Sequence, residues 1–442
     1  MGLILALALL LRFNNYTAAP LFTDNADEVQ FAWAGMNLIE SGDAYSWSYF
    51  PGYPSYSRFE ANGTSYQMVH HWMDHPPLFS YLMGGWVMLL GDRRMSEVAA
   101  WQVRIPPILF SVVAILLAYL LARRFLGSWP SLIGAGLLAT APGAVLLSRQ
   151  AEPEAIQAVL LLAALLLTVR ISEGRAGPWM VPALLLCALL APLAKVSGFA
   201  VAGICAVILV AEGRWRLAAA TLGTGAVGLG LFVVYGAVVD WRLFLHIWTA
   251  QVGNRLGVMS AFDFITAPTG VNRRLRDGWW ILGWIAIGLL ALGRIKRREL
   301  YLVWPAAAYA AAMLVMAGER QIEQYGWYKL MVYPEIYVAA GWLAWEAVSR
   351  RSLGLLTLLL AVGGATASNW WLGGIGGTWV PNPLLLAALL LVVLLPAAIL
   401  LWRRSDVRIR VWARAAAFAA LGVMLLGNAV ESFFLDHIFS IL

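Results

Sequence analysis

The feature that most constrains this chain is a series of long apolar stretches separated by short polar connections. A membrane-spanning helix needs about 20 mostly apolar residues. The sequence therefore predicts an all-α fold, a polytopic helical bundle of about 13 transmembrane helices. The predicted spans are 1–13, 104–122, 129–148, 154–171, 178–195, 198–212, 217–237, 279–293, 300–317, 331–348, 353–370, 383–402 and 411–430.

The composition excludes other protein classes. Apolar residues make up 61% of the chain and charged residues 12%, whereas soluble domains carry about 25% charge. Both cysteines, Cys187 and Cys205, lie in apolar stretches, so neither a disulfide framework nor a thiolate metal cluster is expected. Ordinary soluble enzymes, disordered proteins and coiled coils are thereby excluded.

The distribution of charge predicts the orientation in the membrane. Lys and Arg gather at alternate connections, for example at 123–124, 294–298 and 403–414, and Asp and Glu are in excess in the opposite loops. The positive-inside rule then places the N-terminus in the cytoplasm and the C-terminus outside. The net charge of +7 is explained by this topology, so we expect no nucleic-acid partner.

The long loops all lie on the predicted outer side. We expect a single transmembrane domain over 1–442, with a catalytic first outer loop at 14–103 and a loop at 237–278 that caps the cleft. Functional residues concentrate on loops that a rigid scaffold positions.

Asp27 and Glu28 open the first predicted surface helix, over 27–39. Carboxylates in a first turn interact favourably with the helix dipole, which is the simpler interpretation of the pair. The alternative is a general base held at the bilayer surface, since ionised groups near hydrocarbon are costly and often functional. A second helix, over 78–91, is expected to lie in the outer interface.

Between these two helices, the segment from Tyr45 to Tyr66 has the aromatic and hydroxyl-rich composition of a sugar-binding cleft. His71, Asp74 and His75 have a spacing that could bind a divalent metal ion, or they are polar residues packed at a helix start. A lone histidine, His246, could contact a substrate or simply pack.

Taken in order, several motifs resemble those of the GT-C superfamily of membrane glycosyltransferases, in particular bacterial enzymes akin to protein O-mannosyltransferases and the aminoarabinose transferase of lipid A. The motifs share their order and their side of the membrane. They are Arg12, Asp27-Glu28, His75-Pro76-Pro77-Leu78, Arg104-Ile105-Pro106, Arg123-Arg124, Arg149 to Glu154, Lys195-Val196-Ser197-Gly198, and Tyr325-Gly326-Trp327-Tyr328-Lys329.

The resemblance implies transfer of a sugar from a polyprenyl-phosphate carrier to an acceptor, with inversion. By similarity, Asp27 matches the catalytic carboxylate, with Glu28 beside it, and either Glu152 or Glu154 matches a second acidic position. The cations that could bind the donor phosphate are Lys195, Arg149, Arg320 and Lys329. The residues expected to line the substrate cleft are His75, Tyr66, His246 and Tyr325.

The partners implied are a polyprenyl-phosphate sugar, a lipid, glycan or protein acceptor, and membrane lipids. No cofactor is required, although a divalent cation could take part. The expected location is the bacterial inner membrane, with the active site on the extracytoplasmic side. Two alternatives stay open: a transporter or flippase of lipid-linked sugars, and a non-catalytic protein that binds them. Charges cluster at span ends rather than at mid-membrane, which disfavours transport.

Overall fold

A computed structural model describes residues 1–22, 27–50, 52–253, 278–293, 300–316, 326–349 and 407–436. Two of the predicted spans, 353–370 and 383–402, lie outside the described residues, and each of the others coincides with helical structure. The helices at these positions are α1 (Gly2–Phe13), α5 (Ile105–Leu126), α6 (Ser128–Thr140), α7 (Pro142–Leu147), α8 (Glu154–Ser172), α9 (Met180–Ala194), α10 (Phe199–Ala211), α11 (Trp215–Gly253), α13 (Gly278–Leu292), α14 (Leu300–Met316), α15 (Tyr333–Ser349) and α18 (Val407–Phe433).

Among the described helices, four segments are long and apolar enough to cross a membrane by themselves: Ala100–Leu126, Glu154–Ser172, Trp215–Gln251 and Arg414–Phe433. The predicted span 129–148 is divided in two. Ala141 takes an extended conformation between α6 and α7 (ψ 128°), as a residue before proline tends to do, because the proline ring disfavours the helical conformation there.

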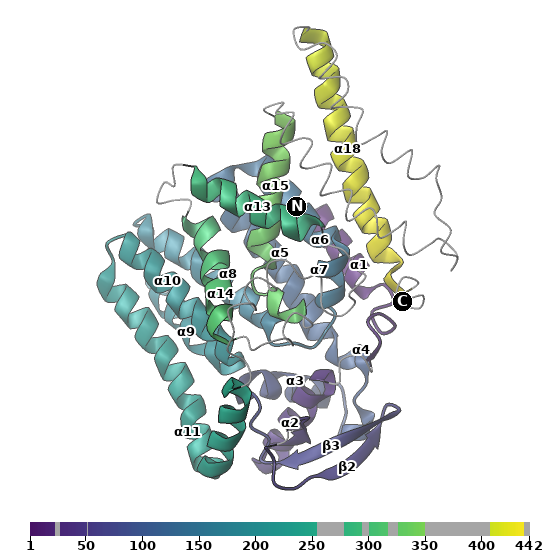
Figure 1. The fold of residues 1–442 in the computed structure, drawn as a ribbon, viewed down its shortest axis with the longest axis vertical. Helices are drawn as coiled ribbons and strands as arrows, with labels where there is room; N and C mark the ends of the chain where they lie inside the picture. The colour runs from purple at the N-terminus through teal and green to yellow at the C-terminus, as the bar shows by residue number, and fades with distance from the viewer. Residues whose placement is uncertain are drawn as a thin grey trace.

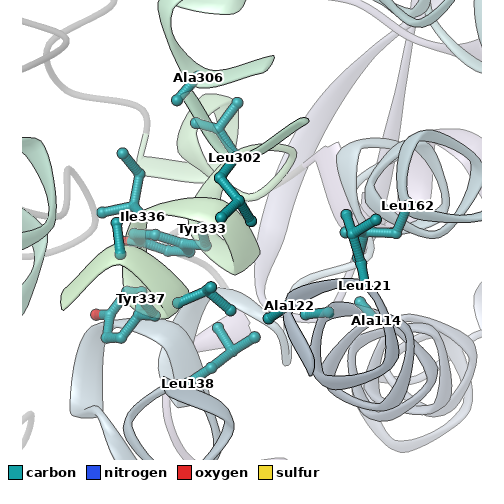
Figure 2. Close-up of a cluster of buried hydrophobic side chains, with 14 of the residues drawn as sticks. Ala114, Leu121, Ala122, Leu138, Leu162, Leu302, Ala306, Tyr333, Ile336 and Tyr337 are labelled. Carbon is teal, nitrogen blue, oxygen red and sulfur yellow. The ribbon is translucent and has the colours of Figure 1, made fainter. Parts of the chain in front are cut away.

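The apolar core of the bundle includes the crossing of α15 and α6. A Cβ atom on Gly134 or Gly341 would overlap the backbone of the facing helix, so both glycines permit the close approach. Small residues commonly let helices approach this closely in membranes. Figure 2 shows the neighbouring core, where Tyr333, Ile336 and Tyr337 of α15 lie among side chains of α5, α6 and α14.

A second hydrophobic cluster forms in the first outer loop, around helix α2 (Asp27–Ser41) and helix α3 (Pro77–Leu89). A Cβ atom at Gly35 would overlap the carbonyl oxygen of Ser80, so the two helices cross with almost no side chain between them. The expected surface helix is therefore mostly buried: its Phe31 and Trp33 are enclosed by the rest of the loop.

The same loop contains a small antiparallel sheet, so the expectation of an all-α chain is wrong for this segment. Its strands are β1 (Tyr45–Trp47), β2 (Ser57–Ala61) and β3 (Thr64–His70), in the order β1-β3-β2. Asn62 and Gly63 both have positive φ and connect β2 to β3, as in the tight turns that hairpins favour. The chain is mostly helical rather than entirely so.

Helix α11 bends sharply at Asp240, whose φ and ψ of −160° and 100° are not helical. The Asp240 carboxylate accepts a hydrogen bond from the Leu243 backbone N–H (3.0 Å), which caps the segment that follows the bend. Figure 1 shows this end of α11 near α2, α3 and the sheet. Trp248 donates to the Met73 carbonyl (3.2 Å), so the segment after the bend contacts the first outer loop.

Candidate functional site

The candidate site is built around the first turn of α2, where the two adjacent carboxylates differ in their surroundings. Asp27 is half-buried and Glu28 fully buried. The two carboxylates therefore differ in their access to solvent, which bears on which of them could act as a general base. A group that exchanges a proton with a substrate needs access to it.

Glu28 forms a buried ion pair with Arg104 at the start of α5. Arg104 Nη2 donates to Glu28 Oε2 at 2.7 Å, and Arg104 Nε lies 3.0 and 3.1 Å from the two carboxylate oxygens. Both side chains have no exposed surface. The same guanidinium also donates to the carbonyls of Tyr16 and Pro20 (2.6 and 2.9 Å). Glu28 is thus engaged in holding the N-terminal segment, α2 and α5 together.

The segment between α7 and α8 joins this arrangement through its backbone. The Ala151 N–H donates to Glu28 Oε1 at 3.3 Å, which brings the neighbouring Glu152 near the start of α2. Arg149 is fully buried and donates to the carbonyls of Leu11, Asn14 and Ala19 (2.7, 2.8 and 2.8 Å). These bonds attach the end of α1 to this segment, and they direct the Arg149 guanidinium toward backbone carbonyls.

A second buried ion pair lies at the end of the segment between α7 and α8. Lys195 Nζ, at the end of α9, is 2.5 Å from Glu154 Oε1 at the start of α8. The ammonium also lies 4.4 Å from the centre of the Tyr328 ring, and it is close enough to Glu152 for an electrostatic attraction. Cations are attracted to the faces of aromatic rings. Lys329, next to Tyr328, lies over the Trp280 ring at 5.0 Å.

These contacts connect the predicted site residues into one region. Asp27 precedes Glu28, Glu28 contacts Ala151, and Glu152 and Glu154 surround Lys195. Glu28 is therefore linked through Ala151 to the segment that carries Glu152 and Glu154, and Glu154 links that segment to Lys195. Two predicted site residues, Arg320 and Tyr325, lie outside the described residues.

Asp74 is a further buried carboxylate close to this region. It accepts hydrogen bonds from the Tyr53 hydroxyl (2.7 Å) and from the Gln30 amide (3.1 Å), one helical turn after Asp27. Burial raises the pKa of Asp74 to about 7, the negative charge of Asp27 adds to the rise, and the hydrogen bonds from Ser48 and Tyr53 oppose it. The Gln251 amide, after the bend in α11, donates to the Asp74 carbonyl at 3.4 Å.

The predicted metal ligands are not brought together. Asp74 is enclosed by Tyr53 and Gln30, and the His75 ring packs near Phe31, with the ring centres 5.3 Å apart. His71 instead lies against a residue that the sequence analysis did not select, since its Nδ1 is 2.8 Å from Asp43 Oδ1. Among the described residues, the group whose ligand atoms lie close together is Asp43, His70 and His71 rather than His71, Asp74 and His75.

The remaining cleft residues differ in their surroundings. The Tyr66 ring packs against Trp33, with ring centres 4.9 Å apart, and is almost fully buried in the loop cluster. His246 lies after the bend in α11, and a Cβ atom at Gly52 would be 3.1 Å from its ring. Tyr53, Gln30 and Asp43 had no motif in the sequence that marked them, because their roles depend on partners distant in the chain.

Comparison with known proteins gives one matching family model and several solved structures with a similar fold. The model of the dolichyl-phosphate-mannose-protein mannosyltransferase family matches residues 74–241. ArnT from Cupriavidus metallidurans, bound to undecaprenyl phosphate, superposes with a TM-score of 0.60 and 16% identity over 99% of this chain and 77% of that chain. No curated protein matches the chain in sequence.

Two other structures share the fold over most of this chain. The oligosaccharyltransferase AglB from Archaeoglobus fulgidus, in complex with an inhibitory peptide and a dolichol-phosphate, gives a TM-score of 0.54 at 14% identity, over 98% of this chain and 55% of that chain. The arabinosyltransferase EmbB from Mycobacterium smegmatis gives a TM-score of 0.56 at 14% identity, over 99% of this chain and 41% of that chain. The chain therefore has the fold of the GT-C membrane glycosyltransferases and resembles both ArnT and the mannosyltransferase family.

Proposed function

We propose that the chain is a glycosyltransferase that moves a sugar from a polyprenyl-phosphate carrier to an acceptor, on the extracytoplasmic side of the bacterial inner membrane. The observation that carries the proposal is that Glu28, next to the half-buried Asp27, accepts a hydrogen bond from the segment that carries Glu152 and Glu154. Glu154 in turn pairs with Lys195, in a chain with the fold of ArnT. The lipid phosphates named in the ArnT and AglB structures support a donor of the same class.

In this proposal Asp27 is the general base. The acceptor hydroxyl gives its proton to the Asp27 carboxylate while its oxygen bonds to the anomeric carbon. The bond between that carbon and the phosphate oxygen breaks, and the polyprenyl phosphate leaves with the electron pair. Attack opposite to the leaving group gives inversion. Proton transfer of this kind contributes about 10²- to 10⁴-fold to a rate.

The assignment of the base to Asp27 follows from its partial exposure and from the partners of Glu28. Both Glu28 oxygens accept hydrogen bonds from Arg104, and one also accepts from the Ala151 N–H. A carboxylate in a buried bidentate pair is a weak proton acceptor, because the guanidinium stabilises its ionised form. Glu28 therefore fits a positioning role, holding the first turn of α2 in place beside the substrate.

Lys195 is the best candidate for contact with the donor phosphate. An ammonium has three N–H donors, and the pair with Glu154 uses one of them. Arg149 is less suited, since its guanidinium already donates to three backbone carbonyls. The acceptor in this proposal is a lipid, a glycan or a protein.

The proposal is tested by incubating the detergent-purified chain with a panel of polyprenyl-phosphate sugars and following free polyprenyl phosphate by mass spectrometry. We expect one donor to release polyprenyl phosphate together with a glycosylated acceptor. Intact donor that binds without being consumed would indicate a non-catalytic binding protein. Donor that moves unaltered between the leaflets of a proteoliposome would indicate a flippase.

A further inference from the structure

We propose that Asp43, His70 and His71 form a binding site for a divalent transition-metal ion, with Zn²⁺ as the fitting example. His70 Nε2 lies 2.9 Å from Asp43 Oδ2, and His71 Nδ1 lies 2.8 Å from Asp43 Oδ1. Within the described residues, these three offer ligand atoms that all lie within 4.8 Å of one another. The site shares His71 with the set His71, Asp74 and His75 that the sequence suggested, and it contains neither Asp74 nor His75.

The backbone holds the three residues in place. Asp43 follows the end of α2, where Gly42 has a φ of 75° and turns the chain toward β1. Tyr45 is paired with His70 across β1 and β3, and the Trp72 N–H donates to the Ala44 carbonyl at 2.8 Å. Strand pairing therefore continues on both sides of His71. Ligands on paired backbone are positioned more accurately than ligands on a loose loop.

The conformation of His71 places two consecutive side chains on one carboxylate. Successive side chains of a strand point to opposite faces, so His70 and His71 would normally diverge. His71 has a φ of 56°, in the left-handed region that non-glycine residues seldom occupy. The imidazole centres are consequently 4.6 Å apart, and both rings reach Asp43.

The donor set and its accessibility suit zinc. Neutral imidazole nitrogens at about 2.0–2.1 Å and a carboxylate oxygen at about 2.0–2.2 Å are its usual ligands, and three protein ligands leave a position for water. The side chains of His70, His71 and Asp43 are 63%, 39% and 29% exposed, so an ion can enter from solvent. The three donor atoms already lie within 4.8 Å of one another, close enough to share one such ion.

The site lies away from the proposed catalytic carboxylate. Asp27 begins α2 and Asp43 follows its end, and a helix of 15 residues is about 22 Å long. In this proposal, a metal ion bound at Asp43 therefore does not contact the donor phosphate. It would instead fix the end of α2 to the end of β3, from which the chain continues to Asp74.

The experiment uses the full chain, purified with a tag that contains no histidine, stripped with a chelator, and titrated with Zn²⁺ alone. We expect about one Zn²⁺ per chain by elemental analysis, and a rise in melting temperature on addition of Zn²⁺. The double variant His70→Ala/His71→Ala should lose both effects. The matched control His246→Ala, which removes an imidazole elsewhere, should keep both.

A second variant keeps the test decisive if the double variant fails to fold. Asp43→Asn retains the size of the side chain and both imidazoles, and it should weaken Zn²⁺ binding at least about tenfold. The proposal is overturned if the wild-type chain binds no Zn²⁺, or if binding is unchanged in Asp43→Asn and in the double variant. Neither readout depends on transferase activity, so the result stands apart from the proposed function.

Discussion

Replacing Glu28 with Gln tests whether this residue positions α2 or takes part in chemistry. The substitution removes the charge that compensates Arg104, and both side chains are fully buried. Removing one partner of a buried ion pair typically costs ~3–5 kcal/mol, since the other charge stays in a poorly solvating environment. We therefore expect Glu28→Gln to lower the free energy of unfolding by about that amount, or roughly two to four powers of ten in the unfolding equilibrium.

The assay is reversible unfolding in mixed micelles with increasing SDS, followed by tryptophan fluorescence. Glu40→Gln is the matched control, because Glu40 is an exposed acid at the other end of the same helix. Its free energy of unfolding should change by less than about 0.5 kcal/mol. In a double-mutant cycle with Arg104→Met, the coupling between the two positions should exceed about 2 kcal/mol.

A loss of transfer without a loss of stability would contradict the positioning role of Glu28. If Glu28→Gln unfolds like the Glu40→Gln control but no longer transfers sugar, then Glu28 acts in the reaction and its pairing with Arg104 is not what holds α2 in place. A coupling near zero in the double-mutant cycle would lead to the same conclusion.

Three further predictions concern neighbouring parts of the fold. Lys195→Met should destabilise the chain by ~3–5 kcal/mol, because it leaves Glu154 buried and unpaired, and adding Glu154→Gln should recover much of the loss in the same SDS titration. Gly35→Ala should cost ~1–3 kcal/mol by forcing α2 from α3, whereas Gly85→Ala, with its nearest neighbour atom 3.8 Å from the new Cβ, should be tolerated. Folding raises the pKa of Asp74 to about 7. The contribution of Asp74 to stability is therefore full below the pKa that it has in the unfolded chain, and it is lost as the pH rises through about 7. Asp74→Asn should therefore reduce the decline in unfolding midpoint between pH 5 and pH 8, and an unchanged decline would refute this assignment.

The helices were the most predictable part of the fold. Apolar length is a local property, and each predicted span within the described residues coincides with helical structure. The break at Ala141 was signalled by the proline that follows it. The count of thirteen spans and the orientation stay predictions, since they depend on segments beyond the described ones and on the side of the membrane.

The sheet of the first outer loop was missed although the sequence contains a signal for it. Asn62-Gly63 lies between two runs that form strands, and this dipeptide is a strong hairpin signal. The long apolar spans elsewhere in the sequence favour an all-α prediction, which this short signal opposes only locally. The sheet matters for the site, since it places Asp43 against His71 and carries the chain to Asp74.

The partners of the site residues could not be predicted from local pattern. Arg104 is 76 residues from Glu28, and Glu154 is 41 residues from Lys195. The sequence indicated carboxylates and cations at span ends, but only the fold determines which of them pair. Arg149 illustrates the limit: its position suggested phosphate binding, and its guanidinium donates to three carbonyls of the N-terminal segment.

The most direct test of the central claim is the rate of transfer from a polyprenyl-phosphate sugar by Asp27→Asn, measured together with binding of the donor. The account predicts that this variant folds, binds the lipid donor as the wild type does, and transfers sugar at least about 100-fold more slowly, because it has lost the general base. A variant that binds the donor and transfers sugar at the wild-type rate would contradict the assignment of Asp27 as the base.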